Sequence, residues 1–404
     1  MENRYDKYKD SGIAWIGEIP EHWELRKGKN LFKLRNSKGN NNAILLAATQ
    51  KYGMIPQSQV EGVVQVKQNT DLNTFKTVHK NDYVISLRSF QGGFEMSEYE
   101  GVCSPAYQVF YSTKPCCNYF FKYMFKSYGF VSQINAFTLG IREGKNIQYE
   151  DFSLMKLPLP TIQEQQSIAT YLDQKCSEID ELITLQEKMI TKLQSYKQSV
   201  ITEAVTKGLD KNVPLKDSGI EWIGEIPEHW KITKIQYLAQ LKSGYNLTTE
   251  EIKDSGLYPV YGGNGIRGYY DKYFLEGDYV LIGRQGALCG NINYSTGKSW
   301  ATEHAVVCYP KTKYITKWFG ELLRVMNLNQ YSLAAAQPGL AVERIKLLPI
   351  PIIPLSEQQS IANYLDQKCS EIDELISIKQ QKIEKLKDYK KSLIFECVTG
   401  KRKV

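Results

Sequence analysis

The chain lacks the features of a membrane or secreted protein. No apolar run approaches the ~18 residues that a membrane helix needs, and the longest, such as residues 43–48, are far shorter. The N-terminal MENRYDKYKDSG is charged and has no apolar core of the kind found in signal peptides. We therefore expect a soluble, cytoplasmic protein without a membrane partner.

The chain is also poor in groups that hold metals or perform thiol chemistry. It has 8 cysteines and 4 histidines in 404 residues, and no C-x-x-C pair, so spacing for zinc or dithiol redox sites is missing. We expect reduced, buried thiols and no bound metal. His22 and His229 recur in a repeated segment without a partner carboxylate or a histidine cluster suited to metal binding or catalysis, which favours a packing or turn contact.

Sequence motifs for the common enzymatic chemistries are absent. There is no Pro-Pro dipeptide for the loop of an amino methyltransferase, and no HExxH, G-x-S-x-G or G-x-G-x-x-G. Residues 295–299 (STGKS) resemble the end of a P-loop, but Ile292 occupies the place of the required glycine. Residues 143–145 and 251–253 have the E-x-K spacing of nucleases without a preceding Pro-Asp. We predict no catalytic residues.

Two nearly identical pairs of segments dominate what is present. Residues 164–183 (EQQSIATYLDQKCSEIDELI) return as residues 357–376 with one change, Thr170 to Asn363. Residues 9–23 (KDSGIAWIGEIPEHW) return as residues 216–230, again with one change, Ala14 to Glu221. Residues 24–163 and 231–356 lie between the repeats and barely resemble each other. The chain thus carries two unlike modules, residues 24–163 and 231–356. Each module is flanked by a nearly identical pair of repeated segments, which we call its mount.

The repeats define four expected regions in a mixed α and β fold. These are a first module with its N-terminal repeated segment (residues 1–160), a central long helix (161–207), a second module (208–354) and a C-terminal long helix (355–404). The chain ends match the two halves of the segment that joins the central helix to the second module, so we expect a pseudo-two-fold, circular organisation with neighbouring termini.

Positive charge is concentrated in the modules. Residues 26–160 hold 17 Lys and Arg against 9 Asp and Glu, a net charge of +8, and residues 231–354 hold 14 against 9, a net charge of +5. The whole chain carries only +7, so the mounts are mildly acidic. This division is expected if the modules bind a polyanion and the mounts bind protein.

Both long helices carry apolar residues in alternating steps of three and four, as in a coiled coil. Lys197 and Lys390 interrupt the two seams at equivalent places. We expect the helices to pack antiparallel, with residues 179–205 spanning about 40 Å. The predicted interface residues are Ile179, Ile183, Ile190, Leu193 and Val200 in the first helix and Ile372, Ile376, Ile383, Leu386 and Leu393 in the second.

Each module contains a β-rich segment that runs into a glycine-bearing turn with an Arg and a Gln. The strand at residues 82–87 leads into RSFQGG, and the strand at residues 278–282 leads into GRQG. Arg pairs bidentately with guanine and Gln with adenine, so the turns suit base reading, although tight turns and structural salt bridges would use the same residues. Candidate DNA contacts are Arg88, Ser89, Gln91, Asn264, Arg267, Arg284 and Gln285, with Lys76 and Lys298 as phosphate contacts.

This arrangement resembles the DNA specificity subunit of Type I restriction–modification enzymes over essentially the whole chain. The resemblance rests on WIGEIPEHW, a module, and then P-x2–5-EQQ with a long helix, in an order that runs twice. It implies a bacterial or archaeal protein in which each module reads one half of a split double-stranded DNA target. It further implies helices that set the spacer and dock two methyltransferase subunits, with restriction subunits joining them.

The resemblance places all cofactors on partners, with S-adenosylmethionine on the methyltransferase subunits and ATP with Mg²⁺ on the restriction subunits. Two alternatives stay open at this point. One is a self-contained restriction or methylation enzyme with a cryptic site, and the other is a protein scaffold whose basic modules bind other proteins.

Overall fold

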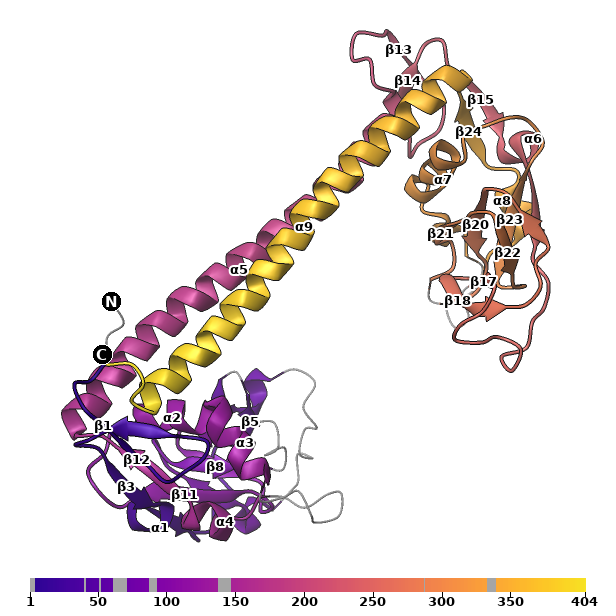
Figure 1. Ribbon diagram of the computed structural model, residues 1–404. Coiled ribbons are helices and arrows are strands. Elements are labelled where there is room, and N and C mark those ends of the chain that lie inside the picture. The colour runs from indigo at the N-terminus through magenta and orange to yellow at the C-terminus, as the bar shows by residue number, and fades with distance from the viewer. Residues whose placement is uncertain are drawn as a thin grey trace. The chain divides into compact units, whose positions relative to one another are not determined.

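The computed structural model describes residues 4–39, 41–50, 52–60, 71–86, 93–136, 147–286, 288–332 and 339–404. The chain forms two compact units (Figure 1). Unit 1 comprises Met1–Gln186 and Gln381–Val404, and unit 2 comprises Glu187–Gln380. The boundaries between the units fall inside both long helices, so each long helix contributes one part to unit 1 and the other part to unit 2.

The module of unit 1 is built on a four-stranded antiparallel sheet in the order β4-β11-β8-β9. These strands are β4 (Phe32–Arg35), β11 (Gln108–Ser112), β8 (Tyr83–Ile85) and β9 (Phe94–Met96). The smaller paired strands are β1 (Tyr8–Asp10) with β2 (Glu18–Pro20), β3 (Glu24–Lys27) with β12 (Lys156–Leu159), β5 (Leu46–Thr49) with β6 (Gly53–Pro56), and β7 (Lys76–Val78) with β10 (Gly101–Cys103).

Aromatic rings fill the space between this sheet and the short helices of unit 1. These helices are α1 (Gly28–Leu31), α2 (Asn118–Lys126), α3 (Tyr128–Ala136) and α4 (Tyr149–Leu154). Phe125 of α2 contacts the rings of Tyr83 and Phe110 from the sheet at centroid distances of 5.2 and 5.9 Å. The aromatic residues at 119–128 are therefore mainly core residues.

One expected helix of unit 1 is split in two. The aromatic-rich sequence of residues 119–128 predicts one continuous helix, but Ser127 adopts an extended conformation between α2 and α3. The Ser127 side chain is buried, and its hydroxyl donates to the Met124 carbonyl at 2.7 Å. This local hydrogen bond competes with continuation of the helix, as serine side chains commonly do.

A buried ion pair gives unit 1 a pH dependence. Glu95 on β9 is 2% exposed and pairs with Lys126 of α2. Burial raises the pKa of the Glu95 carboxyl to about 7, although Lys126 partly opposes the rise. The folded state therefore holds the proton more tightly than the unfolded chain, and the free energy of unfolding falls as pH rises from about 4.5 to about 7.

We expect the loss over that pH range to be no more than about 3 kcal/mol. Glu95→Gln should flatten this part of the stability profile, because the amide does not ionise. Urea unfolding of both proteins at pH 5, 6, 7 and 8 checks this. A wild-type stability that rises across the interval, or an identical profile in the variant, would contradict it.

The module of unit 2 contains two four-stranded sheets. The first has the order β16-β23-β20-β21, all antiparallel, and the second has the order β18-β17-β22-β19, with β17 and β22 parallel. The strands are β16 (Ala239–Ser243), β17 (Tyr258–Gly262), β18 (Gly265–Tyr270), β19 (Leu275–Glu276), β20 (Tyr279–Gly283), β21 (Ile292–Ser295), β22 (Lys298–Ala301) and β23 (Ala305–Pro310). The remaining strand pairs are β13 (Leu215–Asp217) with β14 (Glu225–Pro227) and β15 (Lys231–Lys234) with β24 (Pro349–Ile352).

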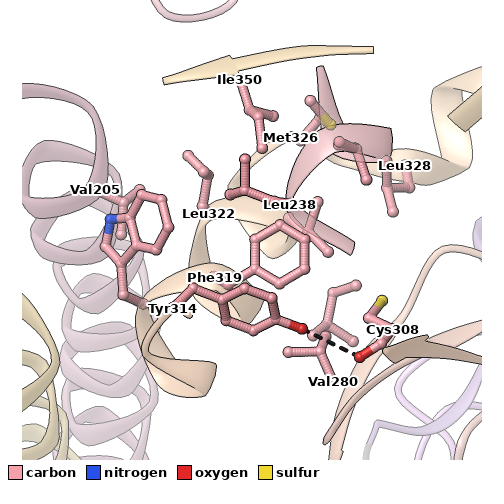
Figure 2. Packing of buried hydrophobic residues seen from close by; sticks show 14 of the residues in the cluster. Val205, Leu238, Val280, Cys308, Tyr314, Phe319, Leu322, Met326, Leu328 and Ile350 are labelled. Carbon is pink, nitrogen blue, oxygen red and sulfur yellow. Dashed lines mark hydrogen bonds between the residues drawn. The ribbon is translucent and has the colours of Figure 1, made fainter. Parts of the chain in front are cut away.

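Helices cover one face of the first sheet of unit 2. They are α6 (Ile235–Leu238), α7 (Thr316–Val325) and α8 (Val342–Ile345). Figure 2 shows Phe319 and Leu322 of α7 among Leu238, Val280 and Ile350, with Val205 of the long helix α5 (Ile162–Lys207) reaching the same cluster. Tyr314 closes one side, where its hydroxyl donates to the Cys308 carbonyl at 3.1 Å.

Two long helices, α5 (Ile162–Lys207) and α9 (Leu355–Val398), carry the mounts. In unit 1 the beginning of α5 packs against the end of α9, since Ile179 and Leu393 share one core cluster. In unit 2 the end of α5 packs against the beginning of α9, since Val205 and Leu365 share another. The helices are thus antiparallel within each unit (Figure 1).

The chain ends meet in unit 1 as the circular organisation predicts. The Tyr8 hydroxyl donates to the Gly400 carbonyl at 3.1 Å, and Gly400 lies against Pro20 and Trp23. In unit 2, Gly208 ends α5 with a φ of +77° and lies against Pro227 and Trp230. The two glycines thus make equivalent contacts. In unit 2 the chain runs on from Gly208 to Pro227 and Trp230, whereas in unit 1 Gly400 and its partners belong to opposite ends of the chain.

Candidate nucleic-acid interface

Two glycine-rich turns of unit 2 lie against each other. One is the turn from β17 to β18 (residues 262–265), and the other follows β20 (residues 283–286). A Cβ on Gly283 would lie 2.2 Å from the Gly263 carbonyl oxygen, so the backbones touch. Asn291 also donates to the Asn264 side-chain oxygen at 2.6 Å. We call these two segments the paired turns.

Backbone hydrogen bonds hold the second of the paired turns on both sides. The Arg284 N–H donates to the His304 carbonyl at 2.8 Å, and the Leu340 N–H donates to the Arg284 carbonyl at 2.9 Å. Gly265 and Gly286 have φ values of +97° and +91°, which favour glycine. The paired turns therefore form a fixed backbone platform for the side chains that they carry.

Three predicted DNA contacts meet on the paired turns. Asn264 and Gln285 are exposed. Arg284 is half-buried, and its Nη1 donates to the Ser243 hydroxyl at 3.2 Å. That bond orients the guanidinium while other donors of its fork stay available for a ligand. The structure thus brings together amide and guanidinium groups that were 20 residues apart in sequence.

The other predicted DNA contacts lie elsewhere. Arg267 is exposed on β18, with its aliphatic part against Gly262. Lys298 is exposed on β22, with its ammonium 4.6 Å from the centre of the Tyr273 ring. Lys76 of β7 is half-buried and donates to the Tyr107 carbonyl. Arg88, Ser89 and Gln91 lie outside the described residues.

All ten predicted interface residues of the long helices are buried or half-buried within their own unit. The lysines that interrupt the apolar pattern make matching ion pairs. Lys390 contacts both carboxylate oxygens of Asp180 at 2.7 Å in unit 1. Lys197 contacts both oxygens of Asp373 at 2.7 and 2.6 Å in unit 2. The interruptions therefore fix the alignment of the helices rather than weaken their packing.

The repeated Glu of EQQ is the carboxylate partner of the repeated histidine, which the sequence did not indicate. His22 and His229 do have carboxylate partners, namely Glu164 at 2.8 Å and Glu357 at 2.7 Å. These pairs were not visible in sequence, because each carboxylate lies more than a hundred residues from its histidine, at the start of a long helix. Burial raises the pKa of the Glu164 carboxyl, but hydrogen bonds from His22, Thr161 and Trp23 outweigh it and leave that pKa lowered.

The repeated Gln that follows fastens each module to its helix. The Gln165 side-chain oxygen accepts from the Cys117 N–H at 3.0 Å, just before α2. The Gln358 side-chain oxygen accepts from the Ile315 N–H at 2.9 Å, just before α7. The same side chain therefore holds the first turn of a module helix in both units, even though the modules differ in sequence.

The comparisons with known proteins agree with this geometry. The family model described as "Type I restriction modification DNA specificity domain" matches residues 20–194 and 227–388, which is most of the chain. The chain belongs to the Type I restriction modification DNA specificity family.

Relatives in this family share different portions of the chain. The EcoprrI specificity subunit of Escherichia coli is 40% identical over 32% of this chain, and that match spans 33% of the relative. A match to the MjaVIII specificity subunit of Methanocaldococcus jannaschii spans 66% of that relative at 26% identity. The putative MjaX specificity subunit of the same organism is 24% identical over 96% of both chains.

Solved structures share the fold at low sequence identity. A chain from "Structural basis underlying complex assembly and conformational transition of the type I R-M system" matches with a TM-score of 0.73 and 14% identity, covering 94% of this chain and 98% of its own. The HsdS subunit from Thermoanaerobacter tengcongensis matches with a TM-score of 0.56 and 15% identity, covering 95% and 98%. The expected family and mixed α and β fold class are thus confirmed.

We searched the described residues for metal-binding clusters and for helices able to span a membrane. They include no group of three or more His, Cys, Asp or Glu side chains that would hold a metal ion. In the same ranges, no helix has the length and apolar character needed to span a membrane. All eight cysteines are free thiols.

Proposed function

We propose that this chain is the DNA-recognition subunit of a Type I restriction–modification complex and that each module reads one half of a split, asymmetric target. The observation that carries the proposal is the contrast between mounts and modules. The mounts repeat the same Glu, Gln and Lys contacts in both units, whereas the modules differ in sequence. Equivalent supports for unlike reading surfaces suit an asymmetric target.

The paired turns supply the chemistry of base reading in unit 2. Asn and Gln pair bidentately with adenine, and Arg pairs with guanine O6 and N7. Asn264, Arg284 and Gln285 therefore reach base edges, and Arg267 extends that surface along β18. Lys298 contributes phosphate binding without base selectivity, because its charged ammonium is exposed on β22.

The antiparallel mount sets the spacer between the two half-sites. Half-sites on one face of B-DNA lie about 34 Å apart per helical turn, and helices locked by Lys–Asp pairs and an apolar seam hold a fixed spacing. A slip in helix alignment would break both ion pairs, Lys197–Asp373 and Lys390–Asp180. The spacer is therefore a property of the repeated segments and not of the modules.

Each unit exposes the same apolar residues on its helices, which suits two equivalent methyltransferase subunits. In unit 1 these are Leu182 and Leu185 of α5, 43% and 47% exposed, with Tyr389 of α9 at 47%. Their repeat equivalents in unit 2 are Leu375, Ile378 and Tyr196, at 46%, 51% and 58%. Exposed apolar side chains three residues apart share one helix face, and apolar surface of this kind marks protein-contact sites. Restriction subunits join through this core, and the partners bind S-adenosylmethionine, ATP and Mg²⁺.

Genome-wide mapping of N6-methyladenine tests the proposal. Cells that express this chain with its cognate methyltransferase subunit are compared with cells that express the methyltransferase subunit alone. We expect one new methylated motif with two specified ends and an unspecified spacer, since two modules read two sequences. No new motif despite a stable complex with the partner would contradict the proposal and favour a protein scaffold.

A further inference from the structure

We infer that Glu303 and His304 form an additional base-reading element of unit 2, an inference that rests on the proposed function. They lie in the turn that leads into β23, directly beside the paired turns. The His304 carbonyl accepts from the Arg284 N–H at 2.8 Å, and a Cβ on Gly263 would lie 3.2 Å from the same oxygen. Any DNA edge that meets Arg284 and Asn264 therefore meets this turn.

The two side chains hold each other in place and stay accessible. His304 Nε2 lies 3.2 Å from Glu303 Oε1, with the side chains 39% and 37% exposed. The other carboxylate oxygen, Oε2, is enclosed and has no hydrogen-bond partner in the described part of the chain. An enclosed acceptor without a donor lowers stability, so the fold itself gains nothing from this carboxylate oxygen.

The fold does not need this pair to make the turn. In unit 1 the equivalent turn leads into β11 as residues 104–107, and the Tyr107 N–H donates to the Ser104 carbonyl at 3.0 Å. In unit 2 the Ala305 N–H donates to the Thr302 carbonyl at 2.9 Å. Pro105 and Ala106 occupy the places of Glu303 and His304. The same backbone bond thus forms with two uncharged residues, so the acidic and imidazole groups serve another purpose.

The charge of the pair selects a base edge over a phosphate. A carboxylate next to a phosphate is repelled, whereas a carboxylate accepts from the exocyclic amino group of cytosine. An imidazole beside it supplies the complementary group to the same base pair. The ligand is therefore a G·C base pair whose cytosine N4 amino group faces the turn in the major groove, and Glu303 both orients His304 and accepts from that amino group.

Methylation mapping of Glu303→Gln and His304→Ala, each with the cognate methyltransferase subunit, tests this inference. Alanine is the residue that the equivalent turn of unit 1 carries, so His304→Ala should leave the melting temperature unchanged. We expect the half-site read by unit 2 to lose discrimination at one base pair by about tenfold. The other half-site and the spacer should stay the same.

His79→Ala is the matched control, because His79 is a 48% exposed histidine 3.8 Å from a carboxylate, that of Glu100, in unit 1. It should leave the unit 2 half-site intact. An unchanged motif in both test variants would overturn the inference while the split motif itself upholds the proposed function. Loss of both half-sites with a lowered melting temperature would reveal a structural role and would also overturn it. If the wild type yields no split motif, the proposed function fails and takes the inference with it.

Discussion

Leu393→Asp should lower the free energy of unfolding by at least about 4 kcal/mol. Leu393 is 0% exposed in α9 and belongs to the core cluster that also holds Ile179 of α5. The substitution removes buried apolar contacts and places a carboxyl group among the apolar side chains of this cluster. Chemical unfolding monitored by circular dichroism measures the change, and we expect DNA binding to be lost with it.

Leu182→Asp is the matched control, since it makes the same change on the exposed side of α5. Leu182 is 43% exposed, so its replacement should change stability by less than about 0.5 kcal/mol. It should nevertheless weaken capture of the methyltransferase subunit, because the charge falls on the proposed docking face. Equal stability of the two variants would argue against a buried seam between the helices.

Gly283→Ala should destroy the unit 2 half-site and spare the unit 1 half-site. A Cβ at this position would lie 2.2 Å from the Gly263 carbonyl oxygen and 3.1 Å from the Leu288 carbonyl oxygen. Both are backbone atoms, so the paired turns must separate. We expect a loss of about 1–3 kcal/mol of stability and methylation that no longer depends on the bases read by unit 2.

Gly297→Asn controls for the general effect of replacing a turn glycine in the same unit. Gly297 has a φ of +61°, with nothing within 4 Å of its would-be Cβ, and asparagine tolerates this conformation. Stability and target should both stay near wild type. If Gly283→Ala also preserved the unit 2 half-site, contact between the two turns would not be what positions the reading groups.

The repeats made the organisation of the fold predictable, because identical segments such as residues 164–183 and 357–376 must find equivalent surroundings. The repeats also predicted a long helix from residue 161, and α5 begins at Ile162. The break at Ser127 was not predictable in the same way. It depends on a side-chain hydrogen bond to Met124, which competes with a pattern that would otherwise continue the helix.

The sequence indicated some residues of the candidate site but not the neighbours that complete it. Gly-rich turns with Asn264, Arg284 and Gln285 stood out in sequence, and the structure brings all three together. Ser243, Asn291, Glu303 and His304 did not stand out, because their roles arise from strands that neighbour each other only after folding. The contact of Lys76 with the Tyr107 carbonyl was not visible in sequence either, because it joins residues 31 positions apart.

The division of the chain into units determines the order in which they can be completed during translation. Unit 2 is one continuous stretch, Glu187–Gln380, whereas unit 1 also needs Gln381–Val404. The module that is synthesised first therefore lacks part of its core until the end of α9 is translated. The missing core residues include Leu393 and Cys397. The second unit acquires its full set of residues earlier. A premature stop near the end of the gene would consequently damage the first-made module and spare the later one.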